Sequence, residues 1–460
     1  MPFSPTGPFD YLSFEPGDLL ITRVFRARVI RIVRLMAVLA LTAARCAPAP
    51  GTGSDMWAIT DVAVIDVVQG RVEDGQTILI EGDRIDAIES VESFDVPTGV
   101  PVVSAPGTFV IPGLFDMHVH LFSEPGPEAR LTQYLKSGVL GVRDMGMPLD
   151  SIPLLRAIVD SASSSVPRVW YTGPALQETR TYDISQVTVP DTSAARRMVE
   201  LLAAAGVTSV KVQDLLSPEL HAAVVRAARE VGLPVVGHIP ITMTPDQVIA
   251  ARQRSIEHLG QTPGMLAGCS ANGALDRETS QRLLNDSLYY QFLTSGEYLA
   301  PVLAAFDADR CERLATRLAQ AEVWQVPTLV LWRAWSRGFP WGPPGDTAHL
   351  AQLLPIALRI TTLLHESGAP IMAGTDNVGT IHDELELLVS AGLSRADALR
   401  AATISPATFL GVADSIGVVA PGYTADLLIL NHNPLEDIGN TRSIRSIIFR
   451  GRVLNPMELD

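Results

Sequence analysis

The central part of the chain repeats one pattern, in which a short apolar run is followed by an amphipathic stretch rich in alanine and leucine. In TSAARRMVELLAAAG and PELHAAVVRAAREVG, apolar residues recur at the spacing of one helix face. The runs expected to be strands are FVIPGLFDMHVHL, GVLGVRDMG, RVWYTGPAL, VTSVKVQ, PVVGHIP, RSIEHLG, VPTLVLW and PIMAGTDN. Eight strand–helix units predict an α/β fold, a (β/α)8 TIM-type barrel, over about residues 111–411.

Both ends of the chain carry a different pattern, short β-like runs separated by turn residues. The runs MWAITDVAVIDVV, QTILIEGDRIDAIE and PVVSAPGTFVIPG precede the barrel, and ADLLILN and SIRSIIFRGRVLN follow it. Alternation of apolar and polar residues between turn signals is typical of strands. We therefore predict one small β-sandwich domain that is formed from both chain ends, residues 51–110 and residues 412–460.

Residues 1–50 have the order of charges and apolar residues found in a leader and linker. RVFRARVIRIVR is followed by LMAVLALTAAR and then by CAPAPGTGS, so arginines precede a short apolar run and a small-residue exit. This order is typical of a secretory signal peptide, and the apolar run is too short for a stable membrane span, which needs ~20 apolar residues. We expect cleavage near residues 43–50 and export to the periplasm or the exterior. A lipid anchor at Cys46 is disfavoured by the charged Arg45 before it.

Composition narrows the classes of partner and compartment. The 460-residue chain has a formal net charge of −15 and a pI near 5.1. Nucleic acids are excluded as partners because phosphate binding needs clustered Lys and Arg. A small-molecule partner is expected, and a homo-oligomer stays open. Cys269 and Cys311 can pair in an oxidising compartment, but free buried thiols are the expected state.

Four of the nine histidines stand at the ends of expected strands, where a barrel places its active site. His118 and His120 form a His-x-His pair, and alternation along a strand turns both rings to one face. His238 and His258 end the expected fifth and sixth strands, and Asp376 ends the eighth. Any one of these histidines also suits a hydrogen-bonded core position. Together they predict a metal site, because imidazole and carboxylate are usual ligands of zinc.

Lys211 is unusual for this chain, which has 33 arginines and only two lysines. It lies at the centre of VTSVKVQ, an apolar strand-like run. A solvated strand-end lysine is the plain interpretation. An amine can also lose its proton when it is desolvated, and then form a Schiff base or take up carbon dioxide. On the residues alone, these uses of the amine stay open.

These strand ends resemble the metal-dependent amidohydrolase superfamily, in the branch of imidazolonepropionase-like enzymes and Xaa-Pro dipeptidases. The resemblance covers nearly all of residues 56–455, and its carriers are PGLFDMHVH, GVRDMG, VKVQ, GHIP, SIEHLG, GTDN and the tail HDELELLVSAGLSRADALRAATISPATFLGV. It implies two divalent metal ions, with zinc as the expected metal. It assigns His118, His120 and Asp376 to one ion, His238 and His258 to the other, and a bridging carbamate on Lys211 to both.

The resemblance also implies a reaction, the hydrolysis of amide-type C–N bonds in a peptide, an N-acyl amino acid or a cyclic amide. Metal-activated hydroxide would attack the carbonyl, and Asp376 would shuttle the proton to the leaving nitrogen. Two alternatives stay open. One is an esterase or carbamate hydrolase that uses the same site, and the other is a barrel protein without hydrolytic activity, since fold alone does not give function.

The substrate is less well specified than the metal ligands. Dipeptidase-like members carry a tyrosine two residues after the fifth-strand histidine, whereas His238 is followed by Ile239 and Pro240. A Gly-His-Gly segment after the third strand is also missing. Both departures argue against recognition of an amino-acid-like carboxylate. The candidates for the substrate wall are Tyr182, Tyr289 and Trp332, and those for orienting a ligand imidazole are Asp144, Glu257 and His382.

Overall fold

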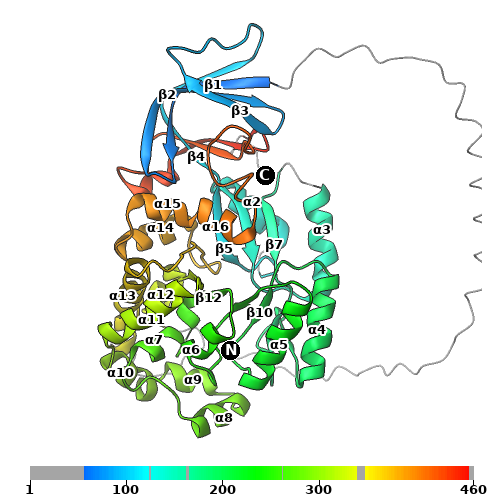
Figure 1. The fold of residues 1–460 in the computed structure, drawn as a ribbon, viewed down its shortest axis with the longest axis vertical. Coiled ribbons are helices and arrows are strands. Elements are labelled where there is room, and N and C mark those ends of the chain that lie inside the picture. Colours follow the sequence, from blue (N-terminus) through cyan, green and yellow to red (C-terminus); the bar gives the residue numbers. More distant parts are fainter. Residues whose placement is uncertain (1–55, 124–125, 162–164, 262, 339–347, 455–460) are drawn as a thin grey trace, which may run out of the picture. The chain divides into compact units, whose positions relative to one another are not determined.

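The structure, a computed structural model, describes residues 56–123, 126–161, 165–261, 263–338 and 348–454 (Figure 1). The predicted leader, with Cys46 and the expected cleavage region, lies outside these residues, so export stays a prediction. Among the described helices, none has the length and apolar character that crossing a membrane requires.

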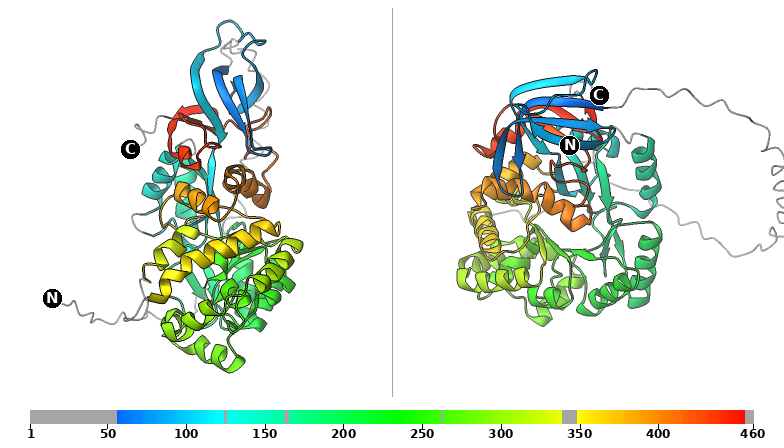
Figure 2. Two further views of the ribbon diagram at one scale, coloured as in Figure 1. Left: turned by 90° about the vertical axis from the view of Figure 1, so that its left-hand side faces the viewer. Right: turned by 45° about the horizontal axis from the view of Figure 1, so that its top comes forward.

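Strands from both ends of the chain join in one seven-stranded sheet, with the order β16-β15-β14-β4-β1-β2-β3 (Figure 2). β1 and β4 pair in parallel, and the other neighbours are antiparallel. The strands are β1 (Met56–Asp66), β2 (Arg71–Glu81), β3 (Arg84–Ser90), β4 (Val102–Pro112), β14 (Leu427–Leu430), β15 (Ile444–Phe449) and β16 (Arg452–Leu454).

The chain around the start of β3 also forms hydrogen bonds with the chain that leads into β14. Ile85 N donates to Tyr423 O at 2.8 Å, and Ala425 N donates to Asp83 O at 2.8 Å. Apolar side chains such as Ile78 and Ile448 are fully buried within the seven-stranded sheet. The two chain ends therefore share one β structure, as expected. In the described residues its strands belong to a single sheet, however, and the two stacked sheets of a sandwich are not seen.

The central part of the chain contains two parallel sheets, with orders β5-β6-β7 and β13-β12-β11-β10-β8-β9. Every strand pair in them is parallel. Parallel strands have all their carboxyl ends at one edge, which is where the candidate residues were expected. The strands are β5 (Leu114–Val119), β6 (Val139–Asp144), β7 (Arg168–Tyr171), β8 (Ala175–Gln177), β9 (Gln186–Thr188), β10 (Val210–Val212), β11 (Val235–Gly237), β12 (Ser255–Glu257) and β13 (Trp324–Val326).

Backbone hydrogen bonds also connect the two parallel sheets to each other. Thr208 N donates to Tyr171 O at 2.9 Å, which joins the end of β7 to the chain before β10. On the other side, Met372 N donates to Gln325 O and Met117 N donates to Ala373 O, both at 2.9 Å. The chain around residues 372–373 therefore lies between β13 and β5.

Two expected strands differ from the structure. The seventh was expected in VPTLVLW, but β13 ends at Val326 and Leu329–Trp335 forms helix α12. Thr328, with a φ of 48°, turns the chain between them. The eighth, PIMAGTDN, makes only an isolated bridge between Ile371 and Gln325 and the backbone bonds above. Short apolar runs do not distinguish a buried strand from a buried helix, which explains the first error.

Helices follow most of the parallel strands, and side-chain caps mark where several begin. Asp191 accepts from Ala194 N at the start of α4, and Ser217 caps α5, which has Pro218 in its first turn. Such caps satisfy backbone N–H groups that have no partner within the helix. The helices other than α12 are α2 (Pro127–Lys136), α3 (Ile152–Ser161), α4 (Thr192–Ala204), α5 (Pro218–Glu230), α6 (Pro245–Ala250), α7 (Gly264–Cys269), α8 (Arg277–Asn285), α9 (Tyr289–Thr294), α10 (Gly296–Ala304), α11 (Ala308–Gln320), α13 (Leu353–Glu366), α14 (Ile381–Ser390), α15 (Arg395–Ala401) and α16 (Ile404–Leu410).

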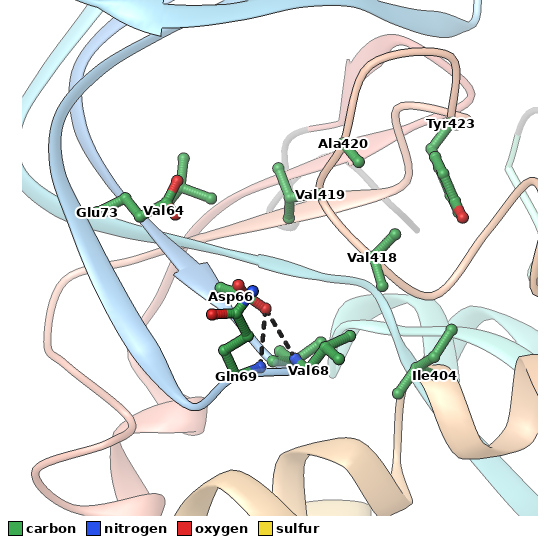
Figure 3. Close-up of a pocket in the computed structure, with 11 residues that line it drawn as sticks. Val64, Asp66, Val68, Gln69, Glu73, Ile404, Val418, Val419, Ala420 and Tyr423 are labelled. Atoms are coloured by element: carbon green, nitrogen blue, oxygen red, sulfur yellow. Dashed lines mark hydrogen bonds between the residues drawn. The ribbon is translucent and has the colours of Figure 1, made fainter.

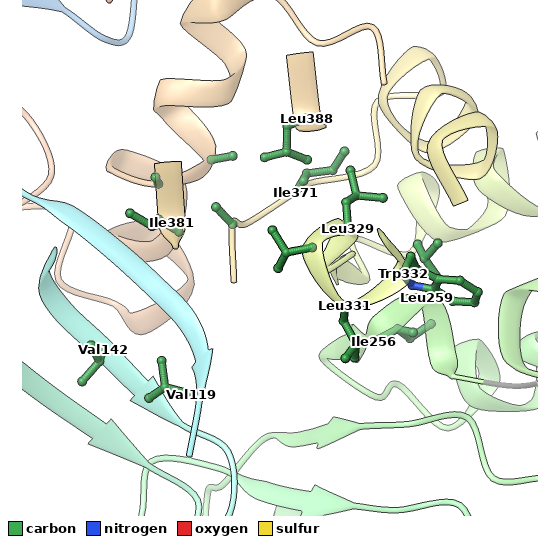
Figure 4. Packing of buried hydrophobic residues seen from close by; sticks show 14 of the residues in the cluster. Val119, Val142, Ile256, Leu259, Leu329, Leu331, Trp332, Ile371, Ile381 and Leu388 are labelled. Carbon is green, nitrogen blue, oxygen red and sulfur yellow. The ribbon is translucent and has the colours of Figure 1, made fainter. Parts of the chain in front are cut away.

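Strands and helices share one large apolar core. Val119 of β5, Val142 of β6, Ile256 of β12 and Leu388 of α14 belong to the same buried cluster (Figure 4). Burying apolar area of this kind contributes about 25 cal/mol per Å². The core therefore provides a rigid base for the side chains that stand at the strand ends.

Cys269 at the end of α7 and Cys311 in α11 form a disulfide, so the expectation of free thiols is wrong. The two half-cystines are 42 residues apart, and their side chains are fully buried. A backbone hydrogen bond joins the two segments at the same place, since Asp307 N donates to Cys269 O at 2.9 Å. We call residues 270–307, which carry α8, α9 and α10, the inserted segment. Sequence spacing could not show that α7 and α11 pack together here.

Candidate metal centre

His118, His120 and Asp376 meet at the carboxyl end of β5. His118 lies in β5 and His120 directly after it, while Asp376 is held beside them by a 2.7 Å hydrogen bond from its backbone N–H to His118 O. Asp376 Oδ1 lies 3.1 Å from His120 Nε2 and 3.6 Å from His118 Nε2. One ligand atom from each residue lies within 4.8 Å of the other two, which suits a single metal ion.

His238, His258 and Lys211 lie beside this group. The ring centroids of His118 and His258 are 4.2 Å apart, and those of His238 and His258 are 5.2 Å apart. Lys211 Nζ lies 3.4 Å from His118 Nε2. The side chains are buried, with Lys211 2% exposed, so the plain interpretation of a solvated lysine is wrong. The structure thus brings together all six residues predicted as ligands.

Each of the four imidazoles uses Nδ1 to contact an oxygen. The oxygens opposite His118, His120 and His238 belong to carboxylates or a backbone carbonyl, which can only accept. The Thr328 hydroxyl donates to Pro327 O at 2.8 Å, so it too accepts from His258. The rings of His118, His238 and His258 therefore carry the proton on Nδ1 and offer the Nε2 lone pair, whereas His120 Nε2 lies 3.1 Å from Asp376 Oδ1 and donates to it in this structure. The pairs are His118–Glu257 Oε2 at 3.0 Å, His120–Gly146 O at 3.3 Å, His238–Asp214 Oδ1 at 2.7 Å and His258–Thr328 Oγ1 at 2.7 Å.

Glu257 is held in turn by a buried arginine. Arg143 Nη2 donates to both Glu257 oxygens, at 2.9 and 2.8 Å, and Ser255 Oγ donates to Glu257 Oε1. Arg143 and Glu257 are fully buried. A charged nitrogen that contacts both oxygens of a buried carboxylate restrains its orientation as well as balancing its charge. It therefore determines the plane in which Glu257 meets His118.

Burial and mutual charge set the protonation of the cluster. Burial, with the nearby positive charges, lowers the pKa of His118. Burial also lowers the pKa of Lys211, against the opposing effect of the acidic side chains around it, Asp376 first. Burial also works against charge on His120, but the hydrogen bond and charge of Asp376 outweigh it and raise the pKa of His120. Burial works to raise the pKa of Asp376, but its interactions with His258, His120 and Lys211 outweigh burial and lower that pKa. The cluster therefore combines an ionised Asp376 carboxylate with neutral rings at His118 and His258, while Asp376 favours the protonated form of His120.

Several residues of the cluster have a left-handed backbone. The φ values are 52° for His258, 48° for Thr328 and 54° for Asp376. Residues other than glycine rarely adopt this region, and such strain is often found at functional sites. Here the turns direct the side chains of His258 and Asp376 at the strand ends.

The three predicted orienting residues have different positions. Glu257 contacts a predicted ligand directly, as described above. Asp144 instead accepts from Leu121 N at 2.7 Å and Gly146 N at 3.0 Å, so it holds the backbone next to His120 and the residue whose carbonyl contacts the His120 ring. His382 does not belong to the cluster, because its ring contacts Thr441 Oγ1 at 2.9 Å and Ser137 O at 3.1 Å.

The three residues predicted to line a substrate site also lie in different environments. Tyr182 is 46% exposed and stacks on Tyr289, with ring centroids 5.6 Å apart. Tyr289 is buried, and its hydroxyl donates to Asp214 Oδ2 at 3.1 Å. Trp332 is 2% exposed and packs against Trp335 in the core, so its position is that of a packing residue rather than a wall.

Sequence reasoning missed several residues that contact the cluster, among them Asp116, Asp214, Arg143, Thr328 and Asn377. Asp116 accepts from Thr375 Oγ1 at 2.6 Å and from His118 N at 3.2 Å, and its burial raises its pKa to about 7. Asp116 stands two positions before His118, on the same strand face, so alternation could have found it. The other four residues lie on segments that are distant in the sequence from their partners. The sequence around each of them therefore does not indicate the pairing.

A separate hollow of about 410 Å³ lies beside the seven-stranded sheet (Figure 3). Val64, Asp66 and Glu73 of the first two strands line it together with Ile404 and Tyr423. None of its lining residues is a histidine or lysine. It therefore does not include the predicted ligands.

Part of the chain matches a known family. Residues 356–454 match the family described as Amidohydrolase family. A stretch of 71 residues is 42% identical to a dihydroorotase of Pelotomaculum thermopropionicum. That match covers 15% of this chain and 16% of the dihydroorotase.

Solved structures share the fold over most of the chain. A Xaa-Pro dipeptidase with bound methionine has a TM-score of 0.65 and 20% identity, over 87% of this chain and 100% of the other. Bottromycin amidohydrolase has a TM-score of 0.65 and 20% identity, over 89% of each chain. At this identity the likeness concerns the α/β fold with its parallel sheets.

Proposed function

We propose that the chain belongs to the metal-dependent amidohydrolase superfamily and is a metal-dependent hydrolase of amide-type C–N bonds, which the family match of residues 356–454 and the shared fold support. The proposed site is the cluster of His118, His120, His238, His258, Lys211 and Asp376. The names of the similar proteins, a dihydroorotase, a Xaa-Pro dipeptidase and an amidohydrolase, support this reaction class.

The observation that carries the proposal is the common orientation of the four imidazoles. Each donates through Nδ1 to an oxygen, so Nε2 is the atom that each ring would offer to a metal ion, after loss of the Nε2 proton in the case of His120. His238 Nε2 is buried and has no hydrogen-bond partner among the described residues. A buried polar atom without a partner is costly, and a metal ion would satisfy it. The donor set therefore fits divalent metal ions, with zinc as the expected metal.

We assign the ligands in two groups. His118, His120 and Asp376 would hold one ion, and His238 and His258 would hold the second. Lys211, buried among them, would bridge as a carbamate, in which the amine nitrogen bonds the carbon of carbon dioxide and releases one proton. A guanidinium does not form this group, which accounts for a lysine in a chain that otherwise uses arginine.

The chain's own residues complete the reaction. Bound divalent ions supply Lewis-acid chemistry, since they acidify water and polarise a carbonyl. The ionised Asp376 carboxylate accepts the proton that the attacking water loses and returns it to the leaving nitrogen. Glu257, Asp214 and Thr328 hold the ligand imidazoles in place.

The same proposal includes a closed barrel. The strands of the two parallel sheets other than β9, with β7 and β8 as one interrupted strand and residues 371–375 as the eighth, would form one ring. The backbone hydrogen bonds between β7 and the chain before β10, and on both sides of residues 372–373, support this closure. A barrel explains why ligands from distant segments meet, because its strand carboxyl ends share one face.

The test is turnover of an amide panel by metal-free and metal-loaded protein. Dipeptides, N-acyl amino acids and lactams represent the proposed class, and esters and carbamates represent the alternative. We expect hydrolysis of at least one amide that is lost on chelation and restored by zinc or manganese. A metal-loaded protein that cleaves only esters or carbamates, or nothing in the panel, would contradict the proposal.

A further inference from the structure

The inserted segment takes part in the hydrogen bonding that holds the His238 ring. His238 Nδ1 lies 2.7 Å from Asp214 Oδ1, and Tyr289 OH donates to Asp214 Oδ2 at 3.1 Å. All three side chains are almost fully buried, at 2%, 4% and 2% exposure for His238, Asp214 and Tyr289. A continuous chain of hydrogen bonds therefore runs from α9 to a proposed metal ligand.

The two ends of this chain of hydrogen bonds come from different parts of the fold. Asp214 lies just after β10 and His238 just after β11, whereas Tyr289 begins α9 in the inserted segment. Backbone bonds also tie Asp214 to the strand ends, because Ile241 N donates to Asp214 O at 2.9 Å. The barrel-side partners are thus fixed by the parallel sheet, and only the tyrosine is brought from outside it.

The plane of the Asp214 carboxylate is fixed only when both of its oxygens are held by hydrogen bonds. With only Oδ1 bonded to His238, the Asp214 carboxylate could still turn about its terminal bond. The Tyr289 hydroxyl holds Oδ2 and so determines the plane in which Oδ1 meets the imidazole. Tyr289 itself is held by the stack with Tyr182, at 5.6 Å between centroids.

We propose that Tyr289 is a positioning residue for His238, acting through Asp214, so that the inserted segment completes the metal centre. The inference rests on the proposed function, because it concerns how tightly that site holds its ions. Residues outside the ligand set that orient ligands commonly change metal affinity by about 10- to 100-fold when they are altered. Tyr289 acts one step further out than Asp214, so the lower end of that range is expected.

Packing gives the competing explanation. Tyr289 also lies in an apolar cluster with Leu215, Leu283 and Leu293, and an aromatic ring alone would fill that space. Tyr289→Phe separates the two explanations, because it keeps the ring and removes only the hydroxyl. A matched control exists in the same segment. Tyr298 OH donates to Gly273 O at 2.9 Å, so Tyr298→Phe removes a hydroxyl bond within the inserted segment that does not reach Asp214.

The experiment titrates metal-free full-length protein with Co²⁺ and follows visible absorption, beside urea unfolding and turnover. We expect Tyr289→Phe to bind at least one cobalt ion about tenfold more weakly, with a changed spectrum, while its unfolding midpoint stays near that of wild type. Asp214→Asn should weaken binding at least as much, and Tyr298→Phe should match wild type.

Each other result overturns the inference in a distinguishable way. Wild-type affinity and spectrum in Tyr289→Phe would remove Tyr289 from the metal centre while leaving the proposed function intact. Equal weakening in Tyr298→Phe would show a general effect of the inserted segment rather than positioning. A wild-type protein that binds no cobalt and cleaves no amide would overturn the proposed function together with this inference.

Discussion

The most informative single substitution is Glu257→Gln, because Glu257 joins a structural ion pair to a proposed metal ligand. Its carboxylate accepts from Arg143, Ser255 and His118, and all of these contacts are buried. Glutamine keeps the shape but has one accepting oxygen and one donating amide. Arg143 and the Nδ1–H of His118 would then compete for a single acceptor, and the guanidinium would lose its counter-charge.

Two effects of different size follow from this geometry. Removing one partner of a buried ion pair typically destabilises a protein by about 3–5 kcal/mol, because the other charge stays buried. Glutamine still accepts one hydrogen bond, so we expect about 3 kcal/mol, at the lower end. Losing the anionic partner of a ligand histidine should weaken metal binding by about 10- to 100-fold.

The assay is urea unfolding of the metal-free protein, followed by a metal titration of the folded variant. The matched control is Glu200→Gln, because Glu200 pairs with Arg196 at 3.0 Å on the exposed face of α4, with half of each side chain in solvent. An exposed pair contributes about 0–1 kcal/mol, so the control should change little. If Glu257→Gln unfolds at the wild-type midpoint and binds metal normally, the orienting role of the Arg143–Glu257 pair is refuted.

Three further predictions concern other parts of the described structure. Lys211→Arg should lose most bound metal, since a guanidinium forms no carbamate, and metal analysis showing a full complement would remove the carbamate assignment. Burial, with the charge of Arg442, lowers the pKa of His382 to about 4 from 6.5. The fold therefore prefers the neutral ring, and the contribution of His382 to the unfolding free energy should fall by about 3 kcal/mol between pH 6.5 and pH 4. A His382→Gln variant with the same pH dependence as wild type would contradict this. Cys311→Ser should cost about 4 kcal/mol in the chain-entropy account of a 42-residue loop, and an unchanged denaturation midpoint would contradict that account.

Residues within one strand were predictable because alternation carries their geometry. His118 and His120 share a face of β5, and that local rule needs no knowledge of the rest of the fold. His238, His258 and Asp376 follow from a second rule, that parallel strands end at one edge. Lys211 was found through its chemistry, as one of two lysines in an arginine-rich chain.

Contacts between distant segments were not predictable, because the residues that make them are ordinary in their own neighbourhoods. In the sequence, Arg143 is an ordinary residue near the end of an expected strand. Only the fold shows that it pairs with Glu257. Tyr289 was expected at a substrate wall and instead reaches Asp214 from the inserted segment. The boundary between β13 and α12 was predicted wrongly for a related reason, since an apolar run such as LVLW suits a buried strand and a buried helix equally.

Asp376 tests the central claim most directly, because the proposal gives it both a ligand role and a proton-transfer role. An asparagine side chain in its place would tolerate the left-handed backbone at this position and could still offer one oxygen, but it could not accept a proton. The measurement is metal content per chain beside kcat for wild type and Asp376→Asn under saturating metal. We predict that the variant keeps an appreciable share of its metal while turnover falls by about 10²-fold or more. Near-normal turnover in a fully loaded Asp376→Asn protein would contradict the account.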